Sequence, residues 1–274
     1  MPKVSEKAKV ISQEKLAPSV YSMWIQTSAA QYAQPGQFIS IYTKDASKLL
    51  PRPISICEIK PEGELRIVYR IAGAGTKEIS EYKAGDEINI VGPLGNGFYA
   101  AVNDSQSESG DFSKEALTIT DTTRALLIGG GIGIPPMLGL AESVSCKKTI
   151  VVGYRNNNEL FLLNELKQNG EVIVATDDGS YGVKGTVIDA IKENKVEADV
   201  IFACGPKPML RGVKALAAEL GIPAFVSMEE RMACGVGACL GCVCQSTNVD
   251  SHSNVKNKRV CVDGPVFLAT EVEL

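Results

Sequence analysis

Residues 124–136 read RALLIGGGIGIPP, and this stretch decides the fold of the second half of the chain. Residues 125–128 form an apolar run typical of a buried strand, and Pro135 and Pro136 begin a helical pattern. Glycines at such a junction let the backbone approach a ligand, and a helix N-terminus offers free N–H groups to a pyrophosphate. We predict a dinucleotide site here, with a tight turn that binds nothing as the alternative. The expected contacts are Gly129, Gly130, Gly131 and Gly133.

Downstream of this stretch, strand-like and helical patterns alternate. Such alternation predicts a doubly wound parallel α/β sheet. The strand-like segments are residues 148–154, 171–179, 198–205 and 223–228, and the helical ones are residues 159–168, 186–194 and 207–221.

Two further strand ends should lie at the same edge of the sheet as the glycines. Cys204 and Gly205 follow one strand, where a small, soft side chain suits the face of a flat cofactor ring. A strand-ending cysteine is also commonly a buried small hydrophobe. Asp177 and Asp178 follow another strand, where a carboxylate can accept hydrogen bonds from ribose hydroxyls. An Asp–Gly turn explains the same residues equally well.

The first hundred residues carry short β-type runs separated by turn residues, at residues 20–26, 37–43, 64–71 and 86–92. This spacing predicts a small antiparallel barrel or sandwich. Arginine, hydroxyl donors and a glycine turn within it suit a phosphate ester, and an aromatic residue suits a flat ring. A solvated arginine and a core tyrosine are the simpler interpretation. The residues concerned are Arg52, Pro53, Ile54, Ser55, Val68, Tyr69, Arg70, Gly75 and Thr76.

Cysteine is the one anomaly of composition: the chain has eight, and five lie between residues 234 and 261. Cys234, Cys239 and Cys242 give C-x4-C-x2-C, and Cys261 follows after eighteen residues. This is the plant-type spacing of a [2Fe–2S] cluster, in which two thiolates hold each iron. Zinc also suits four thiolates, but zinc ribbons usually pair two C-x2-C motifs. Cys244 could exchange roles with Cys242, and we prefer Cys242 because it keeps the x2 spacing.

Composition excludes several classes of protein. Hydrophobic residues make 45% of the chain, charged residues 22%, and the formal charge is −4. There is thus no sequence-wide basic footprint for nucleic acid. The N-terminus lacks the apolar region of a secretory signal, and no apolar run approaches the ~20 residues that span a bilayer. We expect a cytoplasmic protein. The single histidine, His252, cannot build a two-histidine metal site.

Eight motifs occur together in an order that resembles one family. The chain is similar to flavoproteins of the ferredoxin-reductase-like superfamily, and more closely to the electron transfer subunits of class 1B dihydroorotate dehydrogenases. The resemblance covers nearly the whole chain. Its motifs are RPIS at 52–55, VYR at 68–70, GAGT at 73–76, GPLGNGF at 92–98, GGGIGIPP at 129–136, CGPKPM at 204–209, EERMACGVGACLGC at 229–242 and CVDGPVF at 261–267.

This resemblance implies three cofactors: FAD on the barrel residues named above, NAD at the glycine loop, and [2Fe–2S] on Cys234, Cys239, Cys242 and Cys261. It implies a heterotetramer with an FMN-containing catalytic subunit that oxidises dihydroorotate in pyrimidine (UMP) biosynthesis. Electrons would pass from FMN through the cluster and FAD to NAD⁺, with no catalytic residue in the strict sense. It also implies an FAD-binding barrel at 1–101, an acidic linker at 102–121, an NAD-binding α/β domain at 122–227 and a cluster module at 228–274.

Two features depart from the family pattern. The acidic insertion at 103–115 is longer than expected, as is the stretch before Cys261. Two other functions stay open at this point. The chain could serve another complex, such as an NADPH–ferredoxin transhydrogenase, a sulfide dehydrogenase or a hydrogenase. It could also be a zinc-stabilised regulatory module that binds nucleotide without redox chemistry.

Overall fold

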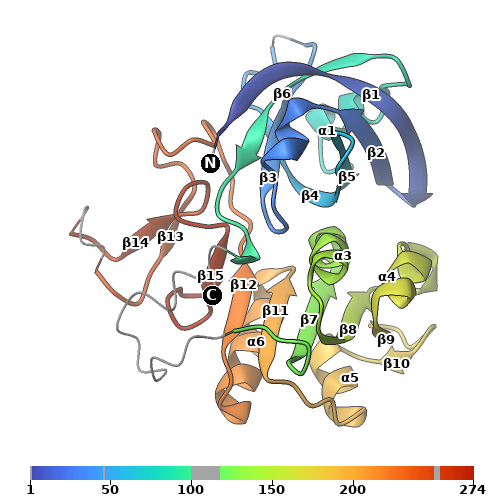
Figure 1. Cartoon of the computed structure of the whole chain (residues 1–274), viewed down its shortest axis with the longest axis vertical. Coiled ribbons are helices and arrows are strands. Elements are labelled where there is room, and N and C mark those ends of the chain that lie inside the picture. The colour runs from blue at the N-terminus through green and yellow to red at the C-terminus, as the bar shows by residue number, and fades with distance from the viewer. Residues whose placement is uncertain (1, 46, 100–117, 250–253) are drawn as a thin grey trace.

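The computed structural model describes residues 2–45, 47–99, 118–249 and 254–274. The chain forms a β-barrel and an α/β domain, and the C-terminal segment lies beside both (Figure 1). Most of the predicted linker at 102–121, including the acidic insertion at 103–115, lies outside the described residues, and so does His252.

Six antiparallel strands close the N-terminal barrel in the order β1-β2-β5-β4-β3-β6. Alternation of side chains along each strand sends one face inward, so Leu65 and Ile67 of β5 are fully buried in the barrel core. Ile79 of the short helix α1 joins that core. The elements are β1 (Val4–Ala17), β2 (Val20–Gln26), η1 (Ser28–Gln31), β3 (Phe38–Tyr42), β4 (Arg52–Lys60), β5 (Glu64–Arg70), α1 (Ala74–Ile79) and β6 (Glu87–Leu94).

Strand β1 completes the barrel because it pairs with β2 along one edge and with β6 along the other. The apolar runs of the sequence do not include this strand. Its buried positions, Ala8, Val10 and Ala17, are small, and exposed lysines alternate with the first two, so the segment looks polar as a whole.

The α/β domain contains a seven-stranded sheet in the order β10-β9-β8-β7-β11-β12-β15. Helices α3 and α4 pack on the face that meets the barrel, and α5 and α6 cover the other face (Figure 1). The elements are β7 (Arg124–Gly130), η2 (Gly131–Gly133), α3 (Ile134–Ser143), β8 (Lys147–Tyr154), η3 (Asn157–Glu159), α4 (Leu163–Asn169), β9 (Glu171–Thr176), β10 (Val183–Lys184), α5 (Val187–Glu193), β11 (Val200–Cys204), α6 (Lys207–Leu220) and β12 (Ala224–Ser227). The predicted combination of an antiparallel barrel and a doubly wound sheet is confirmed.

The helix predicted over residues 159–168 is wrong in its first half, since α4 begins only at Leu163. Leu162 has a left-handed backbone with φ of +61°, which a continuous helix cannot contain. The hydroxyl of Tyr154 donates a hydrogen bond of 2.6 Å to the carbonyl of Phe161. Leu160–Leu162 therefore act as apolar anchors of a loop rather than as one face of a helix.

The C-terminal segment returns to the sheet of the preceding domain. Its strand β15 (Val266–Leu268) pairs antiparallel with β12, while β13 (Val243–Gln245) and β14 (Asn257–Arg259) form a separate hairpin. The segment thus extends the parallel sheet by one antiparallel strand. None of the helices in the described part of the chain is long and apolar enough to cross a membrane.

Candidate functional site

The predicted glycine loop lies where the strand order of the sheet reverses. Strand β7 has β8 on one side and β11 on the other, so loops after β7 and β11 leave the sheet in opposite directions. Open α/β sheets bind ligands at such a switch point. Gly129 and Gly130 end β7, and Cys204 ends β11 in register with Gly129. The structure therefore brings the glycine loop and the Cys204–Gly205 pair to one edge.

The glycines of this loop serve two different purposes. A Cβ at Gly133 would lie 2.2 Å from the carbonyl oxygen of Cys204, and one at Gly130 would lie 2.5 Å from the sulfur of Met209. These positions are glycine because neighbouring elements pack too closely for a side chain. Gly131 has φ of +53° and open space around it. Gly131 is thus the position whose backbone a ligand can approach.

Cys204 is 1% exposed and packs in the core of the α/β domain, as the interpretation of this residue as a buried small hydrophobe expects. Burial, followed by the negative charge of Glu229, raises the pKa of its thiol to about 12. The thiol is therefore protonated at neutral pH, which excludes a thiolate nucleophile.

Asp177 and Asp178 follow β9, and Asp178 forms the turn that the sequence offered as the alternative. Its Oδ1 accepts hydrogen bonds from the amide of Ser180 at 2.9 Å and from the hydroxyl of Ser180 at 2.6 Å. Ser180 in turn accepts a hydrogen bond of 2.7 Å from the amide of Asn157 in the loop after β8. The neighbouring carboxylate, that of Asp177, has no hydrogen-bond partner among the described residues.

Arg52, at the start of β4, lies against a glycine of the neighbouring helix. A Cβ at Gly75 would lie 2.0 Å from Nε of Arg52, so a side chain at this position would displace the guanidinium. Arg52 donates to the carbonyl of Leu50, and no carboxylate of the described residues pairs with it. The hydroxyl of Thr76 accepts hydrogen bonds from the amides of Ala72 and Gly73 and orders the turn before α1. An unpaired guanidinium beside an ordered glycine turn fits a phosphate group.

The other predicted barrel residues divide between the two faces of their strands. Ile54 packs on the barrel core, whereas the hydroxyl of Ser55 is partly exposed and has no partner among the described residues. Val68 packs in the core shared with α3. Tyr69 points into the barrel, where its hydroxyl donates to Oε1 of Gln13 at 2.7 Å. Burial raises the pKa of Tyr69, whose side chain is a core residue of the barrel, as the simpler interpretation of this tyrosine expects.

Arg70 joins the barrel to the α/β domain. Its Nη2 lies 3.1 Å from Oε2 of Glu159 in η3, and both side chains are partly buried. The sequence analysis did not identify Glu159, and no motif or spacing marks it. The ion pair is visible only once the two domains are packed together.

The four predicted ligand cysteines lie in one loop region in which backbone amides point at sulfur. The amide of Val236 donates to Sγ of Cys234 at 3.5 Å, and that of Gly241 donates to Sγ of Cys239 at 3.4 Å. The amide of Cys261 donates to Sγ of Cys242 at 3.4 Å. Amide hydrogen bonds of this kind stabilise thiolates, which are the form that binds metal.

These cysteines form two pairs. The side chain of Cys239 contributes to the pKa shift of Cys234, and that of Cys242 contributes to the pKa shift of Cys261. Burial opposes ionisation of Cys234, but hydrogen bonds led by the amide of Val236 lower its pKa to about 6. Burial, then the bond with Cys242, raises the pKa of Cys261 to about 12. No three His, Cys, Asp or Glu side chains of the described residues converge as a single metal ion requires.

Cys244 lies apart from this arrangement. It is buried in β13 opposite Lys258, and burial, followed by the charge of Glu230, raises the pKa of its thiol. It shares no described hydrogen bond with another cysteine. Cys242, two residues earlier, is the residue in contact with Cys261.

Asn96 fastens the cysteine segment to the barrel. Its amide N–H donates to the carbonyl of Gly264 at 2.6 Å, and its Nδ2 donates to the carbonyl of Val262 at 3.0 Å. A Cβ at Gly235 would lie 3.0 Å from Oγ of Ser40 in β3, so the cysteine loop also contacts the barrel directly. Sequence reasoning missed Asn96, although it lies inside the GPLGNGF motif.

Two family models match this chain. Residues 229–273 match the iron–sulfur cluster binding domain of dihydroorotate dehydrogenase B, and residues 127–215 match the oxidoreductase NAD-binding domain. The first match lies within the predicted cluster module, 228–274, and the second lies within the predicted NAD-binding domain, 122–227.

Curated relatives match along almost their whole length. The electron transfer subunit of dihydroorotate dehydrogenase B (NAD(+)) from Streptococcus mutans is 41% identical over 276 residues, which covers 99% of either chain. The subunit of the same name from Geobacillus kaustophilus is 41% identical, with 98% of either chain covered.

Solved structures agree with the architecture. The structure of an NADH-dependent reduced ferredoxin-NADP oxidoreductase, studied for flavin-based electron bifurcation, has a TM-score of 0.80 and 31% identity, and covers 97% of this chain and 89% of that one. A ferredoxin NADP+ reductase from Neisseria gonorrhoeae with bound FAD and NADP has a TM-score of 0.62 at 14% identity, with 79% and 92% covered. The second likeness concerns the fold alone.

Proposed function

The chain belongs to the family of electron transfer subunits of NAD⁺-dependent dihydroorotate dehydrogenase B, and from that premise we propose which of its residues hold each cofactor and where the catalytic partner binds. As an oxidoreductase subunit of this family, it uses [2Fe–2S], FAD and NAD. The observation that supports the residue assignment is the packing of the four-cysteine segment against the barrel through Asn96, because the proposed cluster ligands and the proposed flavin-binding residues belong to these two neighbouring parts.

The cluster is held by two thiolate pairs. Cys234 and Cys239 hold one iron, and Cys242 and Cys261 hold the other, in keeping with the hydrogen bond from the amide of Cys261 to the sulfur of Cys242. The two pairs suit two metal centres better than the single tetrahedral ion of a zinc site. The amides of Val236, Gly241 and Cys261 stabilise the negative sulfurs and thereby influence the reduction potential.

The FAD site lies on the side of the barrel that faces α3. Arg52 binds phosphate beside Gly75, the hydroxyl of Ser55 is available to the ring, and the main chain of β5 lines the same surface. The remaining contacts are Pro53, Ile54, Val68, Tyr69, Arg70 and Thr76.

The NAD site lies at the switch point of the sheet. The backbone of Gly131 approaches the pyrophosphate, and Gly129, Gly130, Gly133 and Gly205 allow the close packing that shapes the loop. Cys204 ends β11 in register with Gly129 and is assigned to the nicotinamide side of this site.

A flavin exchanges both single electrons and a hydride, so bound FAD supplies the chemistry that links a one-electron cluster to NAD⁺. The residues of this chain perform placement. The ion pair of Arg70 with Glu159 and the packing of Gly139 against β4 hold the flavin-binding and nicotinamide-binding surfaces in a fixed relation.

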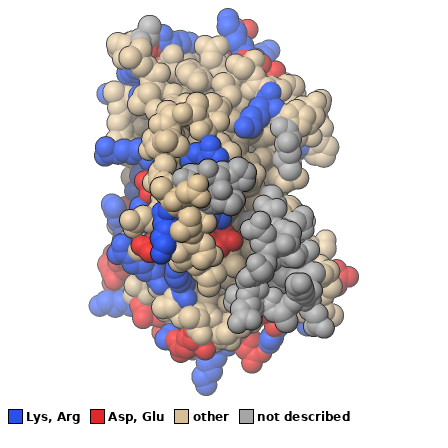
Figure 2. Space-filling view, turned by 90° about the vertical axis from the view of Figure 1, so that its left-hand side faces the viewer, with Lys and Arg blue, Asp and Glu red and all other residues tan. Residues whose placement is uncertain are grey.

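The catalytic partner, an FMN-containing dihydroorotate dehydrogenase subunit, binds the face formed by the cysteine segment. Four of the exposed large apolar residues belong to this segment: Val236, Leu240, Val249 and Val255. Figure 2 shows this side of the molecule, where uncharged described surface lies beside an edge rich in Lys and Arg. Two copies of each subunit form the complex, in the cytoplasm. An uncharged centre with a charged rim is typical of such interfaces.

The domain division follows the same assignment. Residues 1–101 bind FAD, residues 102–121 link the domains, residues 122–227 bind NAD and residues 228–274 hold the cluster. Because β15 pairs with β12, the cluster module and the NAD domain share one sheet.

The test is anaerobic reduction of NAD⁺ by the complex purified from its own cell, with dihydroorotate as the sole electron donor. We expect activity that disappears when this chain is removed, and loss of both iron and activity in Cys234→Ser. A complex that contains flavin and iron but does not use dihydroorotate would contradict the proposed partner. Intact cluster content and transfer in Cys234→Ser would contradict the proposed ligands.

A further inference from the structure

Two consecutive leucines are exposed directly before the proposed phosphate-binding arginine. Leu49 is 82% exposed and Leu50 is 54% exposed. Leu49 is the most exposed large apolar side chain among the described residues. Both lie in the connection from β3 to β4, and only Pro51 separates them from Arg52. Adjacent exposed leucines are costly to leave in water and often mark a contact surface.

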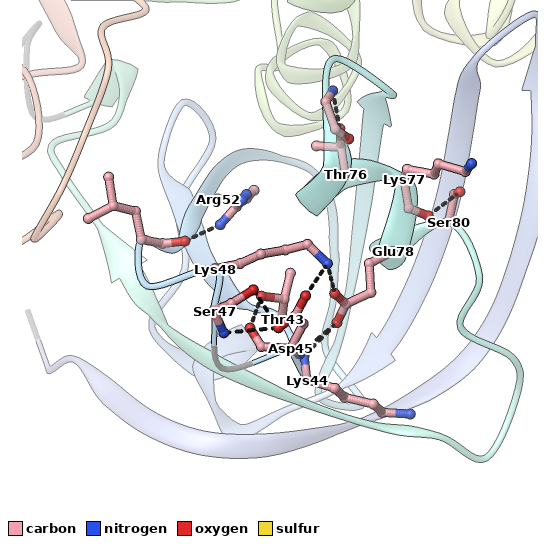
Figure 3. A network of polar contacts seen from close by, with 12 residues as sticks. Thr43, Lys44, Asp45, Ser47, Lys48, Arg52, Thr76, Lys77, Glu78 and Ser80 are labelled. Carbon is pink, nitrogen blue, oxygen red and sulfur yellow. Dashed lines mark hydrogen bonds and ion pairs between the residues drawn. The ribbon is translucent and has the colours of Figure 1, made fainter.

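This connection is held in place by one carboxylate of helix α1, as Figure 3 shows. Oε2 of Glu78 lies 2.6 Å from Nζ of Lys48, and Oε1 of Glu78 accepts a hydrogen bond of 2.5 Å from the amide of Lys44. Lys48 also pairs with Asp45 at 3.0 Å. The side chains of Lys48 and Glu78 are only 21% and 17% exposed. The leucines are therefore presented by an anchored loop.

The same loop contacts Arg52. The guanidinium donates to the carbonyl of Leu50 on one side and packs against Gly75 on the other. A cation without a carboxylate partner thus lies next to two exposed apolar side chains. An adenine nucleotide combines the complementary features, since its phosphates are anionic and its base has a flat apolar face.

We propose that Leu49 and Leu50 form the wall that contacts the adenine of FAD, and that Glu78 is the positioning residue that holds this wall next to Arg52. The inference rests on the proposed FAD site and extends it to the adenylate half of the cofactor. Glu78 acts through Lys48 and the amides of the loop, without touching the cofactor itself.

The test compares three ligands on the flavin-free full-length chain. FAD carries flavin, pyrophosphate and adenine, ADP carries only the last two, and FMN lacks the adenylate. In Leu49→Ser/Leu50→Ser, we expect the dissociation constants of FAD and ADP to rise about tenfold, while that of FMN stays unchanged. Leu220→Ser, which removes a 45% exposed leucine from α6, is the matched control and should leave all three constants unchanged.

The role of Glu78 is tested in the same titrations. Glu78→Gln should raise the dissociation constants of FAD and ADP about three- to tenfold, because the amide side chain no longer pairs with Lys48. Lys48→Met should have a smaller effect, since Glu78 still accepts from the amides of Lys44 and Asp45. Glu219→Gln breaks the exposed ion pair with Lys192 and is the control.

The outcomes separate the two proposals. If the unaltered chain binds no flavin, the proposed function fails. If it binds FAD and the leucine variant binds FAD, ADP and FMN as the unaltered chain does, only the adenine wall is overturned. Equal weakening of FAD binding and FMN binding in the leucine variant would also overturn the adenine wall. Weaker assembly of the variant with the catalytic partner, at unchanged FAD affinity, would overturn it too. The last result would assign the leucines to a protein interface.

Discussion

The backbone amide of Cys261 donates a hydrogen bond of 3.4 Å to the sulfur of Cys242, across 19 residues of sequence. This contact joins the last cysteine of the chain to the cysteine loop, although the two are separated by the β13–β14 hairpin. It also distinguishes Cys242 from Cys244, the other thiol that the sequence spacing left open as a cluster ligand.

Cys242→Ser should lose most of the bound iron and sulfide, because one thiolate of the Cys242–Cys261 pair is gone. Cys244→Ser should retain both and cost about 1 kcal/mol of stability at most, as its buried thiol only packs. Iron and acid-labile sulfide contents, measured beside the visible spectrum, distinguish the variants. Retention of the cluster in the first and its loss in the second would reverse the assignment.

The glycine loop predicts a contrast between two alanine substitutions. Gly133→Ala should destabilise the chain by about 1–3 kcal/mol, since its Cβ would lie 2.2 Å from the carbonyl of Cys204. Gly131→Ala meets no atom within 4 Å and should cost only about 1 kcal/mol for its positive φ. It should nevertheless weaken NADH binding about tenfold. Urea unfolding and NADH titration of both variants check this, and unchanged NADH binding in Gly131→Ala would remove this residue from the site.

The ion pair of Arg70 with Glu159 predicts coupling between the domains. Glu159→Gln should lower stability by about 0.5–1 kcal/mol, because both side chains are partly buried. Glu219→Gln, whose ion pair with Lys192 is 55% and 61% exposed, should lower it by less. Thermal unfolding at low and high salt measures both. An equal effect of the two substitutions would show that the Arg70 pair is no stronger than a surface pair.

Glu142 of α3 predicts a dependence of stability on pH. Burial, followed by the negative charge of Glu58 in β4, raises its pKa from 4.5 to about 7, with Arg66 and Glu165 as the other charged neighbours. The folded chain therefore retains this proton to a higher pH than the unfolded chain. The stabilising contribution is complete below the unfolded pKa and is lost as pH rises to about 7.

Glu142→Gln should remove this loss. Because the side chain is still reached by solvent, the gain over the unaltered chain at pH 8 should stay near or below about 1 kcal/mol, with no gain at pH 4.5. Glu193→Gln on the exposed side of α5 is the control. Urea unfolding across this pH range provides the measurement, and a gain that is the same at every pH would exclude ionisation of Glu142 as the cause.

Patterns within short segments were sufficient for much of the architecture. Apolar runs with glycine and proline boundaries located β7, α3, β8, β11 and α6, because burial on a sheet or under a helix leaves a local periodicity. The same logic failed at β1, whose buried positions are small, and at residues 159–162, whose leucines and phenylalanine anchor a loop. In both places, packing against other elements outweighed the local pattern.

By itself, the sequence determined the chemistry that the chain carries. The cysteine spacing, the glycines between β7 and α3, and the order of the motifs are local features, and local spacing limits which atoms can hold a cluster or approach a phosphate. The tertiary structure alone decided which distant residues meet. Glu159 reaches Arg70 across 89 residues, and Asn96 reaches Val262 across 166. Such contacts arise because whole domains pack together, and no pattern within one segment records which partner that packing will supply.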